Sequence, residues 1–393
     1  MNSILLDKHL AQTTPFPVGL EVSHAQGSWI YTTDGKKYLD MISGLSVMNM
    51  GHGSVNVSTA VNEQLKKHAH VMVYGEYAQS APEKLARTLT SLLPKSLDSC
   101  YFLNSGTEAI EAAIKLCRRS TGRSELIAFN GSYHGASTGS LAISSNEEKK
   151  YHARPLMPDI RFINLNKHSD LEHITEKTAG VFLETIQGDA GIRIPNSDFI
   201  QALRNRCTEV GALLILDEIQ AGMGRTGKLF AFEHYGIKPD ILCLGKALGA
   251  GLPIGAMISS REQMEKFTTN PMLGHITTFG ANPVVCAAAH AGLKELVESN
   301  IISSVKEKGD YLKNALTNLS AVKEIRHIGL FMAVELDSTE AVQNAFNHCL
   351  KNGVITFWFL SCPNAFRPAP PLNISQDELE TGARIIQNAL KSI

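Results

Sequence analysis

Four short apolar runs constrain the fold of this chain more than any other feature of its sequence. They cover residues 126–129, 181–184, 213–217 and 241–244, and each has the length of a buried strand. Strands that are apolar along their whole length are typical of a parallel sheet with helices on both faces. Residues 197–210, between the second and third runs, have the length of a crossover helix. We therefore expect an α/β fold with a largely parallel sheet, whose functional site lies beyond the carboxyl ends of the strands.

Other patterns divide the chain into two domains, because 393 residues exceed what a single hydrophobic core usually organises. Asp34-Gly35, between two strand-like runs within residues 27–42, predicts a hairpin. Towards the carboxyl end, the patterns predict a helix over 283–317, a strand over 331–336, and helices over 338–352 and 376–391. We expect residues 56–286 to form the large domain. Residues 287–393, joined by the N-terminal segment 1–55, should form a smaller α+β domain.

The composition argues against several classes of protein. Hydrophobic residues make up 44% and charged residues 19%, with a net charge of −1, so no binding to nucleic acid or to a membrane is expected. No apolar run reaches the roughly 18–20 residues of a membrane helix, and Met1–Pro17 lacks the apolar core of a signal peptide. The seven cysteines include no Cys-x-x-Cys pair. This pattern indicates reduced thiols in a cytoplasmic protein rather than disulfides or a metal site.

Lys246 is the residue that says most about chemistry. It follows an apolar strand-like run and enters a glycine-rich turn, with no charged neighbour between Asp240 and Arg261. Desolvation disfavours the ammonium form of a lysine, so an amine placed here should titrate low and act as a nucleophile in Schiff-base chemistry. The alternative from this segment alone is a buried lysine at a strand end that pairs with a carboxylate.

Residues 104–109, Asn-Ser-Gly-Thr-Glu-Ala, fall where a strand over 101–103 ends and a helix over 107–119 begins. Gly106 lets the backbone approach a ligand closely, and the free amides of a first helical turn form an anion site that suits a phosphate. Ser105 and Thr107 add hydroxyl donors. A simple helix cap would use the same residues, and no P-loop motif is present.

Polar side chains also follow another buried strand. Asp217 ends the run 213–217, and Gln220 lies three residues further on. A carboxylate here could bond a protonated ring nitrogen, and the amide could donate to a ring oxygen. The alternative, a metal-binding aspartate, lacks the P-loop that would accompany it. Tyr133, in Gly-Ser-Tyr-His-Gly, offers an aromatic face on which a planar ring could stack, although a packed loop would look the same.

Together these features call for a planar, phosphorylated aldehyde with a basic ring nitrogen, and pyridoxal 5'-phosphate fits each of them. Lys246 would form the covalent link, and the helix start at 105–107 would take the phosphate. Asp217 would keep the ring nitrogen protonated, which makes the ring an electron sink.

At this point the chain resembles a known family. It looks like a class III (subgroup II) aminotransferase of pyridoxal-phosphate fold type I, the group that contains ornithine, acetylornithine and 4-aminobutyrate aminotransferases. The resemblance runs nearly end to end, and its motifs follow in family order: residues 104–109, 184–188, 217–227, Lys246 with its glycines, 275–283 and 367–372.

The resemblance implies a role for each cofactor-binding residue. The amides of Gly106 and Thr107 would hold the phosphate, and Tyr133 and Ile219 would cover the two ring faces. The remaining contacts would come from Asp217 to the ring nitrogen, Gln220 to the phenolic oxygen, and Thr278 to the phosphate of the neighbouring subunit of a homodimer with shared sites.

For the substrate, the resemblance implies that Arg367 holds a carboxylate, because a guanidinium binds a carboxylate through two hydrogen bonds. Without the resemblance, a surface arginine in a proline-rich loop is the alternative. Glu184 would support Asp217 or the substrate side. Asp189, in a place where the family usually has Glu, would pair with Arg367, and its shorter side chain could leave the arginine free more often.

Two further departures concern substrate choice. Ala136 stands where ornithine and acetylornithine enzymes usually have an arginine for a distal carboxylate, and Leu45 replaces a tyrosine of the ornithine-specific members. The stretch 74–77 is expected to line the same pocket. The sequence does not identify the amino donor, but it favours one with an uncharged or amine-bearing tail.

The predicted activity is a ping-pong transfer of an amino group from an amino acid or amine to a keto acid, by family default 2-oxoglutarate, with Lys246 as the general acid–base. An amino-acid racemase or epimerase on the same fold is the alternative, since it would use the same cofactor residues. A non-enzymatic relative is a weaker hypothesis, because the lysine and its electrostatic partners are all present.

Overall fold

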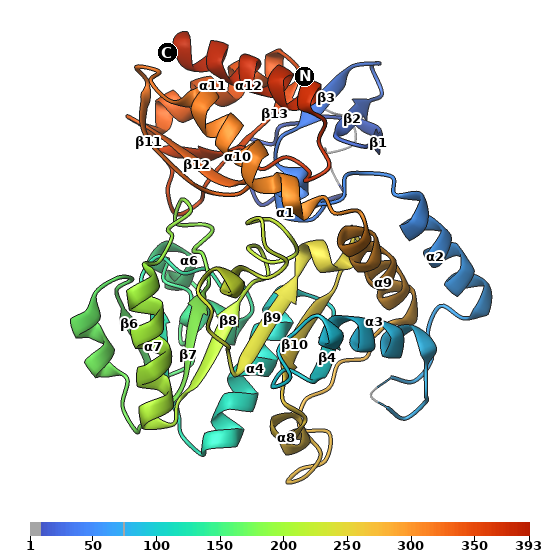
Figure 1. Cartoon of the computed structure of the whole chain (residues 1–393), viewed down its shortest axis with the longest axis vertical. Coiled ribbons are helices and arrows are strands. Elements are labelled where there is room, and N and C mark those ends of the chain that lie inside the picture. Colours follow the sequence, from blue (N-terminus) through green and yellow to red (C-terminus); the bar gives the residue numbers. More distant parts are fainter. Residues whose placement is uncertain (1–8, 74) are drawn as a thin grey trace.

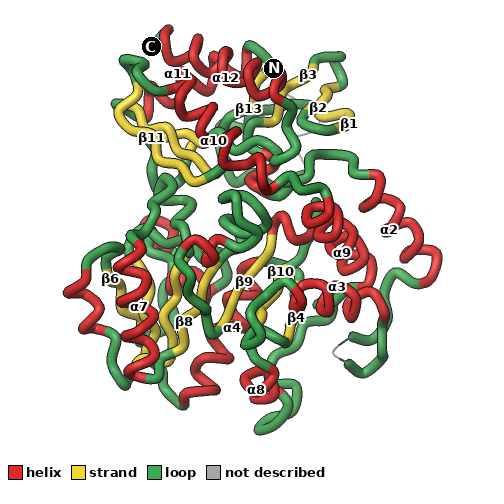
Figure 2. The backbone as a smooth tube through the Cα atoms, viewed as in Figure 1, coloured by secondary structure: helices red, strands yellow, loops and turns green. Residues whose placement is uncertain are grey.

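The computed structural model describes residues 9–73 and 75–393. Figure 1 shows a larger part built around a mostly parallel sheet, and a smaller part that contains the described C-terminus and two further sheets. Figure 2 shows helices in front of the larger sheet and behind it. The predicted α/β fold with a largely parallel sheet is therefore confirmed.

Within the described residues, the larger sheet has seven strands in the order β4-β10-β9-β8-β7-β5-β6. Their bounds are β4 Ser99–Leu103, β5 Glu125–Phe129, β6 Ile160–Ile163, β7 Thr178–Glu184, β8 Leu213–Asp217, β9 Ile241–Gly245 and β10 Gly255–Ser259. The pairs β5–β6, β5–β7, β7–β8 and β8–β9 are parallel, whereas β10 runs antiparallel to both β4 and β9. The carboxyl ends of the parallel strands therefore meet at one edge of the sheet.

The apolar runs are explained by burial on both faces of this sheet. In β7, Val181 and Leu183 pack into one hydrophobic cluster, whereas Phe182 packs into another on the opposite face. Successive side chains of a strand point to opposite faces, so both faces must be apolar when both are covered. The helix α4 (Gly106–Thr121) lies against one face, and α7 (Ser197–Val210), the predicted crossover helix, lies against the other.

The other helices of the larger part are short or lie at its flank. They are α2 Val55–Lys67, α3 Ser80–Ser91, α5 Thr138–Ile143, α6 Glu147–Tyr151, α8 Arg261–Met264 and α9 Pro283–Glu298, with 3-10 turns η2 His168–His173, η3 Ala231–His234, η4 Lys246–Gly249 and η5 Glu265–Phe267. The helix α9 packs on α2 and α3.

The smaller part contains two four-stranded sheets and three helices within the described ranges. The first sheet has the order β1 (Val22–Gln26), β2 (Trp29–Thr32), β3 (Lys37–Asp40), β13 (Val354–Ile355). The second has the order β11 (Val322–Ile328), β12 (Phe331–Leu336), β15 (Ala365–Arg367), β14 (Phe357–Trp358). The helices are α10 Ile302–Leu316, α11 Thr339–Lys351 and α12 Gln376–Lys391. Because β13 pairs with β3, segments near the two ends of the chain share one sheet.

The predicted hairpin at Asp34-Gly35 is confirmed, with Gly35 in the left-handed region at φ 80°. The single helix predicted over 283–317 is wrong, since α9 ends at Glu298 and α10 begins at Ile302. Between them Asn300 has φ 54°, a left-handed conformation that stops a helix and that asparagine tolerates better than most residues.

The domain boundaries proposed at 55/56 and 286/287 remain predictions, and α9 spans the second of them. Tyr74, in the stretch 74–77, and residues 1–8 of the N-terminal segment lie outside the described residues. Among the helices that the structure describes, none is both long enough and apolar enough to cross a membrane.

Candidate active site

A cavity of about 400 Å³ opens beyond the carboxyl ends of β7, β8 and β9. It collects side chains from both parts of the molecule. The residues predicted from the sequence that line it are Gly106, Thr107, Tyr133, Glu184, Asp189, Asp217, Ile219, Gln220, Lys246 and Arg367. Ser105 lies directly beside it as the cap of α4, and Thr278 lies outside it.

Lys246 enters the cavity directly after the last residue of β9. Burial lowers the pKa of its amine, because the loss of water outweighs the attraction of the carboxylates of Asp217 and Glu184. Its backbone has φ 44°, a sparsely populated region for a residue with a side chain, and such strain occurs often at functional sites. The structure thus supplies a buried lysine that gives up its proton more readily than an exposed one.

The start of α4 offers free backbone amides to the cavity. Ser105 caps the helix by accepting a hydrogen bond from the amide of Glu108, and the next amides have no partner within the helix. A side chain at position 106 would have its Cβ 2.9 Å from Ile219, so only glycine fits. The Thr107 hydroxyl lies 2.6 Å from the hydroxyls of both Ser137 and Ser140, which fixes it at the cavity wall.

Glu111, one turn further along α4, holds the facing loop in place. Its carboxylate accepts hydrogen bonds from the amides of Gly139 and Ser140 and from the Ser137 hydroxyl, at 2.6–2.9 Å. A negative charge at the start of a helix is stabilising, here at α5. The loop after β5 is therefore anchored to the helix that would bind an anion.

The carboxylate of Asp217 is fixed by two hydrogen bonds. One oxygen accepts from the amide of Ile219 at 3.0 Å, and the other lies 2.8 Å from Nδ1 of His134. Both side chains are buried. The His134 ring also lies edge-on to Phe182. The carboxyl group of Asp217 is therefore held in one orientation at the end of β8.

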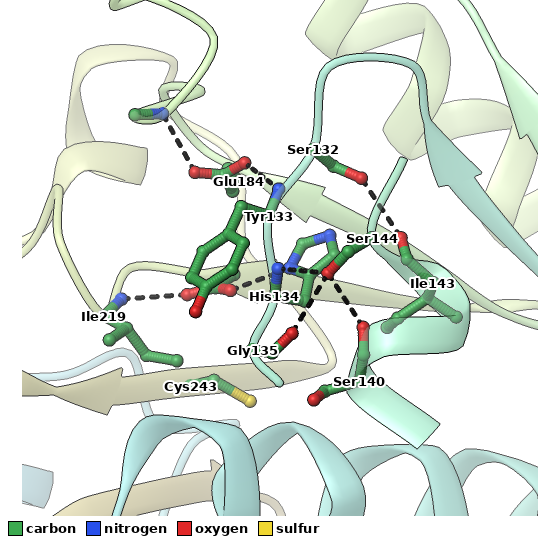
Figure 3. A network of polar contacts seen from close by, with 12 residues as sticks. Ser132, Tyr133, His134, Gly135, Ser140, Ile143, Ser144, Glu184, Ile219 and Cys243 are labelled. Atoms are coloured by element: carbon green, nitrogen blue, oxygen red, sulfur yellow. Dashed lines mark hydrogen bonds and ion pairs between the residues drawn. The ribbon is translucent and has the colours of Figure 1, made fainter. Parts of the chain in front are cut away.

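His134 is the functional residue that the sequence interpretation missed as the partner of Asp217. Figure 3 shows the side chains of Tyr133 and His134, both from the loop after β5. The sequence does contain His134 directly after Tyr133, but the interpretation assigned a role only to the aromatic face of Tyr133. Tyr133 lines the cavity as expected, and Lys149 Nζ lies 4.9 Å from the centroid of its ring.

Glu184 supports the aromatic loop. Its two carboxylate oxygens accept hydrogen bonds from the amides of Tyr133 and Gly188, both at 2.9 Å, and Figure 3 shows the first of these. Burial raises the pKa of this carboxyl to about 7. A group with that pKa can gain or lose a proton near neutral pH, which is the range in which catalytic groups operate.

Arg367 enters the cavity from β15, in the smaller part. Its guanidinium lies 4.1 Å from the centroid of Phe359, and Nη2 is 3.4 Å from both Asp189 and the carbonyl oxygen of Trp358. Burial lowers its pKa. Within the described residues, Nε is buried and has no hydrogen-bond partner. This guanidinium therefore has donor capacity left for a ligand.

Asp189 divides its hydrogen bonds between several partners. One oxygen accepts from the Ser361 hydroxyl at 2.7 Å, and the other accepts from the amide of Leu360 at 3.2 Å and from Arg367 at 3.4 Å. The distance to Arg367 exceeds the usual range for a charge-assisted hydrogen bond, which is about 2.7–2.9 Å. The ion pair with Arg367 is therefore the longest of these contacts.

The side of the cavity away from β8 is mainly apolar. Leu45 reaches it from α1 (Ser43–Ser46), a turn whose residues have left-handed φ values of 44–63°. Such a conformation costs roughly 1–2 kcal/mol for each residue other than glycine. The other wall residues are Ala136, Phe357, Trp358 and Leu360, and Phe357 and Trp358 stack at 4.1 Å between ring centroids.

Thr278 lies on an exposed stretch between β10 and α9 and does not line the cavity of its own chain. This stretch also exposes Met272, Leu273, Ile276 and Phe279. No cluster of three or more metal-binding side chains occurs in the part of the chain that the structure describes.

Comparison with known proteins relates this arrangement to one family. The family model for "Aminotransferase class-III" matches residues 11–390. Acetylornithine aminotransferase of Methanopyrus kandleri is 37% identical over 393 residues, covering 99% of this chain and 98% of that protein. Putrescine aminotransferase of Pectobacterium atrosepticum is 35% identical over 406 residues, covering 99% of this chain and 86% of that protein. A structure of ornithine aminotransferase from Toxoplasma gondii, with pyridoxal phosphate at partial occupancy in its active site, has a TM-score of 0.91 at 26% identity, covering 99% of this chain and 93% of that one.

Proposed function

This chain belongs to the class-III aminotransferases, which use pyridoxal 5'-phosphate, and we propose that it carries the amino group of an amino acid or amine to 2-oxoglutarate by a ping-pong reaction. The observation that carries this proposal is the juxtaposition of Lys246, Asp217 and the start of α4 around one cavity. The relatives named above are all aminotransferases, and none supports the alternative of a racemase or epimerase.

The residues of the cavity fit the cofactor. The amine of Lys246 has a lowered pKa, as covalent attachment to an aldehyde requires. Gly106 and Ile219 lie so close that a Cβ at position 106 would be 2.9 Å from the Ile219 side chain. The amides of Gly106 and Thr107 suit a phosphate, and Asp217 suits a protonated ring nitrogen.

Each of these residues has a separate task in the proposed reaction. When bound, the cofactor withdraws electrons from the α-carbon of the donor, which makes the proton on that carbon acidic. Asp217, held by His134, keeps a negative charge beside the ring nitrogen. The amine of Lys246 would take the proton from the α-carbon as a general base. We assign Tyr133 and Ile219 to the two ring faces, and Gln220 to the phenolic oxygen.

Arg367 is proposed to bind the carboxylate of the substrates. Its unpartnered Nε and its long contact with Asp189 support this role, because the guanidinium can exchange a weak partner for a carboxylate with two oxygens. 2-Oxoglutarate carries such a group beside the carbonyl that accepts the amine.

We further propose that two copies of the chain complete the site. Thr278 is exposed and does not line the cavity of its own chain, which is compatible with a residue that serves the phosphate site of a partner. The apolar side chains exposed beside it suit burial in a dimer interface. A cytoplasmic location is inferred from the seven cysteines, which are all free thiols in the structure.

The tail of the donor is proposed to be uncharged or amine-bearing. Among the described residues that line the cavity, Lys246 and Arg367 are the only Lys or Arg side chains, and the wall at Leu45, Ala136 and Phe357 is apolar. A tail carboxylate buried against that wall would lose its water without a cationic partner, at a cost of roughly several kcal/mol. The second carboxylate of 2-oxoglutarate is therefore expected to stay in contact with water rather than pack against this wall. The variant Ala136→Arg should improve the use of donors with a distal carboxylate about tenfold, relative to Ala136→Leu as a control for size.

A panel of amine donors with 2-oxoglutarate, scored by the formation of glutamate, tests the proposed activity. The panel should pair donors that share a chain length and differ in the charge of the tail. Transfer from at least one donor, with stoichiometric glutamate, supports the proposal. Inversion of a donor's configuration without loss of its amino group would instead support the racemase.

A further inference from the structure

Arg225 is a buried charged residue that none of the roles above uses. It lies in the loop after β8, five residues beyond Gln220, and its side chain is the largest of those that are fully buried in the described chain. Arginine is rarely buried to this extent without a partner of opposite charge.

The guanidinium of Arg225 donates to four acceptors in three segments of the chain. Nη1 donates to the carbonyl oxygens of Leu330, at 3.2 Å, and Pro370, at 2.7 Å. Nη2 donates to the hydroxyl of Ser43, at 2.8 Å, and to the side-chain oxygen of Asn49, at 2.5 Å. One planar group thus joins the loop after β8 to the smaller part and to the N-terminal segment.

This contact differs from an ordinary buried ion pair. No carboxylate among the described residues forms an ion pair with Arg225, although the charge of Asp40 acts on it from a distance. Burial accordingly lowers the pKa of Arg225 to about 9. An apolar side chain would fill the same space without the cost of burying a charge. The arginine therefore contributes orientation rather than packing alone.

Two of the segments that Arg225 holds also reach the cavity, whereas the one at Leu330 does not line it. Ser43 lies two residues before Leu45, and Pro370 lies three residues after Arg367. The loop that contains Arg225 also contains Ile219 and Gln220, which line the cavity. The guanidinium of Arg225 thus links three segments that line the cavity. They carry Leu45, Arg367, and the pair Ile219 and Gln220.

The turn α1 is the segment that most needs such a support. Its four residues, 43–46, all have left-handed φ values. A strained backbone persists only where its surroundings hold it. The Ser43 hydroxyl accepts from Arg225 and donates to the carbonyl oxygen of Ala369 at 2.9 Å, so it links the strained turn to the segment that follows Arg367.

We propose that Arg225 is a positioning residue for substrate carboxylates. By its hydrogen bonds, the guanidinium holds the segments that carry Arg367 and Leu45 in a fixed position relative to Ile219 and Gln220. The proposal rests on the proposed role of Arg367. It predicts that weakening the contacts of Arg225 lowers the affinity for a carboxylate ligand much more than the affinity for the cofactor.

The test uses purified holoenzyme and glutarate, which has carboxylates but no carbonyl that could react. Two variants perturb the contact to different degrees. Arg225→Lys keeps the charge but loses the planar set of donors, and Ser43→Ala removes one acceptor. Arg123→Met is the matched control, because Arg123 also donates to backbone carbonyls, of Thr178 and Val210, but does not line the cavity.

Glutarate affinity is measured by calorimetry, cofactor affinity by absorbance, and the KM and kcat for 2-oxoglutarate by glutamate formation. We expect Arg225→Lys to weaken glutarate binding and raise the KM at least tenfold, with kcat and cofactor affinity within threefold of wild type. Ser43→Ala should weaken glutarate binding about threefold, and Arg123→Met by less than twofold. Glutarate affinity within twofold of wild type in Arg225→Lys and Ser43→Ala, or an equal loss of cofactor affinity, would overturn the proposal.

The outcomes also separate this proposal from the proposed activity. If Arg225→Lys does not fold, Ser43→Ala decides by the same measurements. If wild-type holoenzyme does not bind glutarate, the role of Arg367 fails and the positioning role fails with it. If glutarate binding responds as expected but no donor yields glutamate, the proposed activity alone is overturned.

Discussion

Replacement of His134 by phenylalanine is expected to slow the chemical step about 10- to 150-fold while leaving the cofactor bound. The ring of phenylalanine keeps the contact with Phe182 but has no donor for Asp217, which now accepts from Nδ1 at 2.8 Å. A hydrogen bond to a charged group is worth about 1.5–3 kcal/mol, and about 1.4 kcal/mol corresponds to a tenfold change in rate.

The loss should appear in the rate rather than in binding. Asp217 keeps its contact with the amide of Ile219, so it stays near the ring, but its second oxygen is no longer held. A carboxylate that can rotate away from the ring nitrogen stabilises the protonated ring less. The affinity for the cofactor also depends on the phosphate contacts at Gly106 and Thr107, which the substitution does not touch.

The assay is a single-turnover reaction with saturating donor, followed through the absorbance of the cofactor. His134→Asn is the matched variant, because its side-chain amide places a donor close to the position of the histidine Nδ1. We expect it to restore most of the rate. Wild-type speed in His134→Phe, or an equally large loss in both variants, would refute the role of His134 as the support of Asp217.

Three further experiments test other parts of the account. Asp217→Asn should retain cofactor but lose at least a thousandfold in turnover, since a charge contact in a dry site is worth roughly several kcal/mol; normal turnover, measured as kcat with saturating donor, would make Asp217 a structural residue. The pKa of Glu184 is raised from 4.5 to about 7, so the folded state binds its proton more tightly than the unfolded state. The contribution of this group to the unfolding free energy of the cofactor-free protein should therefore fall by about 3 kcal/mol as the pH rises from below 4.5 to above 7. Urea titrations should show a smaller fall in Glu184→Gln, and an unchanged pH dependence would contradict the buried carboxyl. Mixed Lys246→Ala and Thr278→Ala proteins should form heterodimers with one intact site and activity above either parent, whereas a fully active monomer in size-exclusion chromatography would exclude a shared site.

The fold was predictable because its main signal is local. The residues of β7 and β8 are apolar on both faces, and this pattern by itself requires a sheet that is covered twice. The same runs also located much of the site. Asp217 and Lys246 follow adjacent parallel strands, so the topology brings them to one edge of the sheet.

Contacts over long sequence separations were not predictable. His134 and Asp217 are 83 residues apart, and the sequence does not state which donor a carboxylate meets. The four acceptors of Arg225 span residues 43–370, and two of them are backbone carbonyls, which have no signal in the sequence. The helix break at Asn300 was missed for a different reason: apolar residues recur at helical spacing both before and after it.

Reduction of the holoenzyme with borohydride, followed by peptide mapping, tests the central claim most directly. The claim is that the amine of Lys246, whose pKa is lowered by burial at the end of β9, holds the cofactor. We expect a yellow protein that loses its visible band on reduction and carries one cofactor adduct per chain, on Lys246. An adduct on another lysine, or a Lys246→Ala variant with wild-type turnover, would contradict the account.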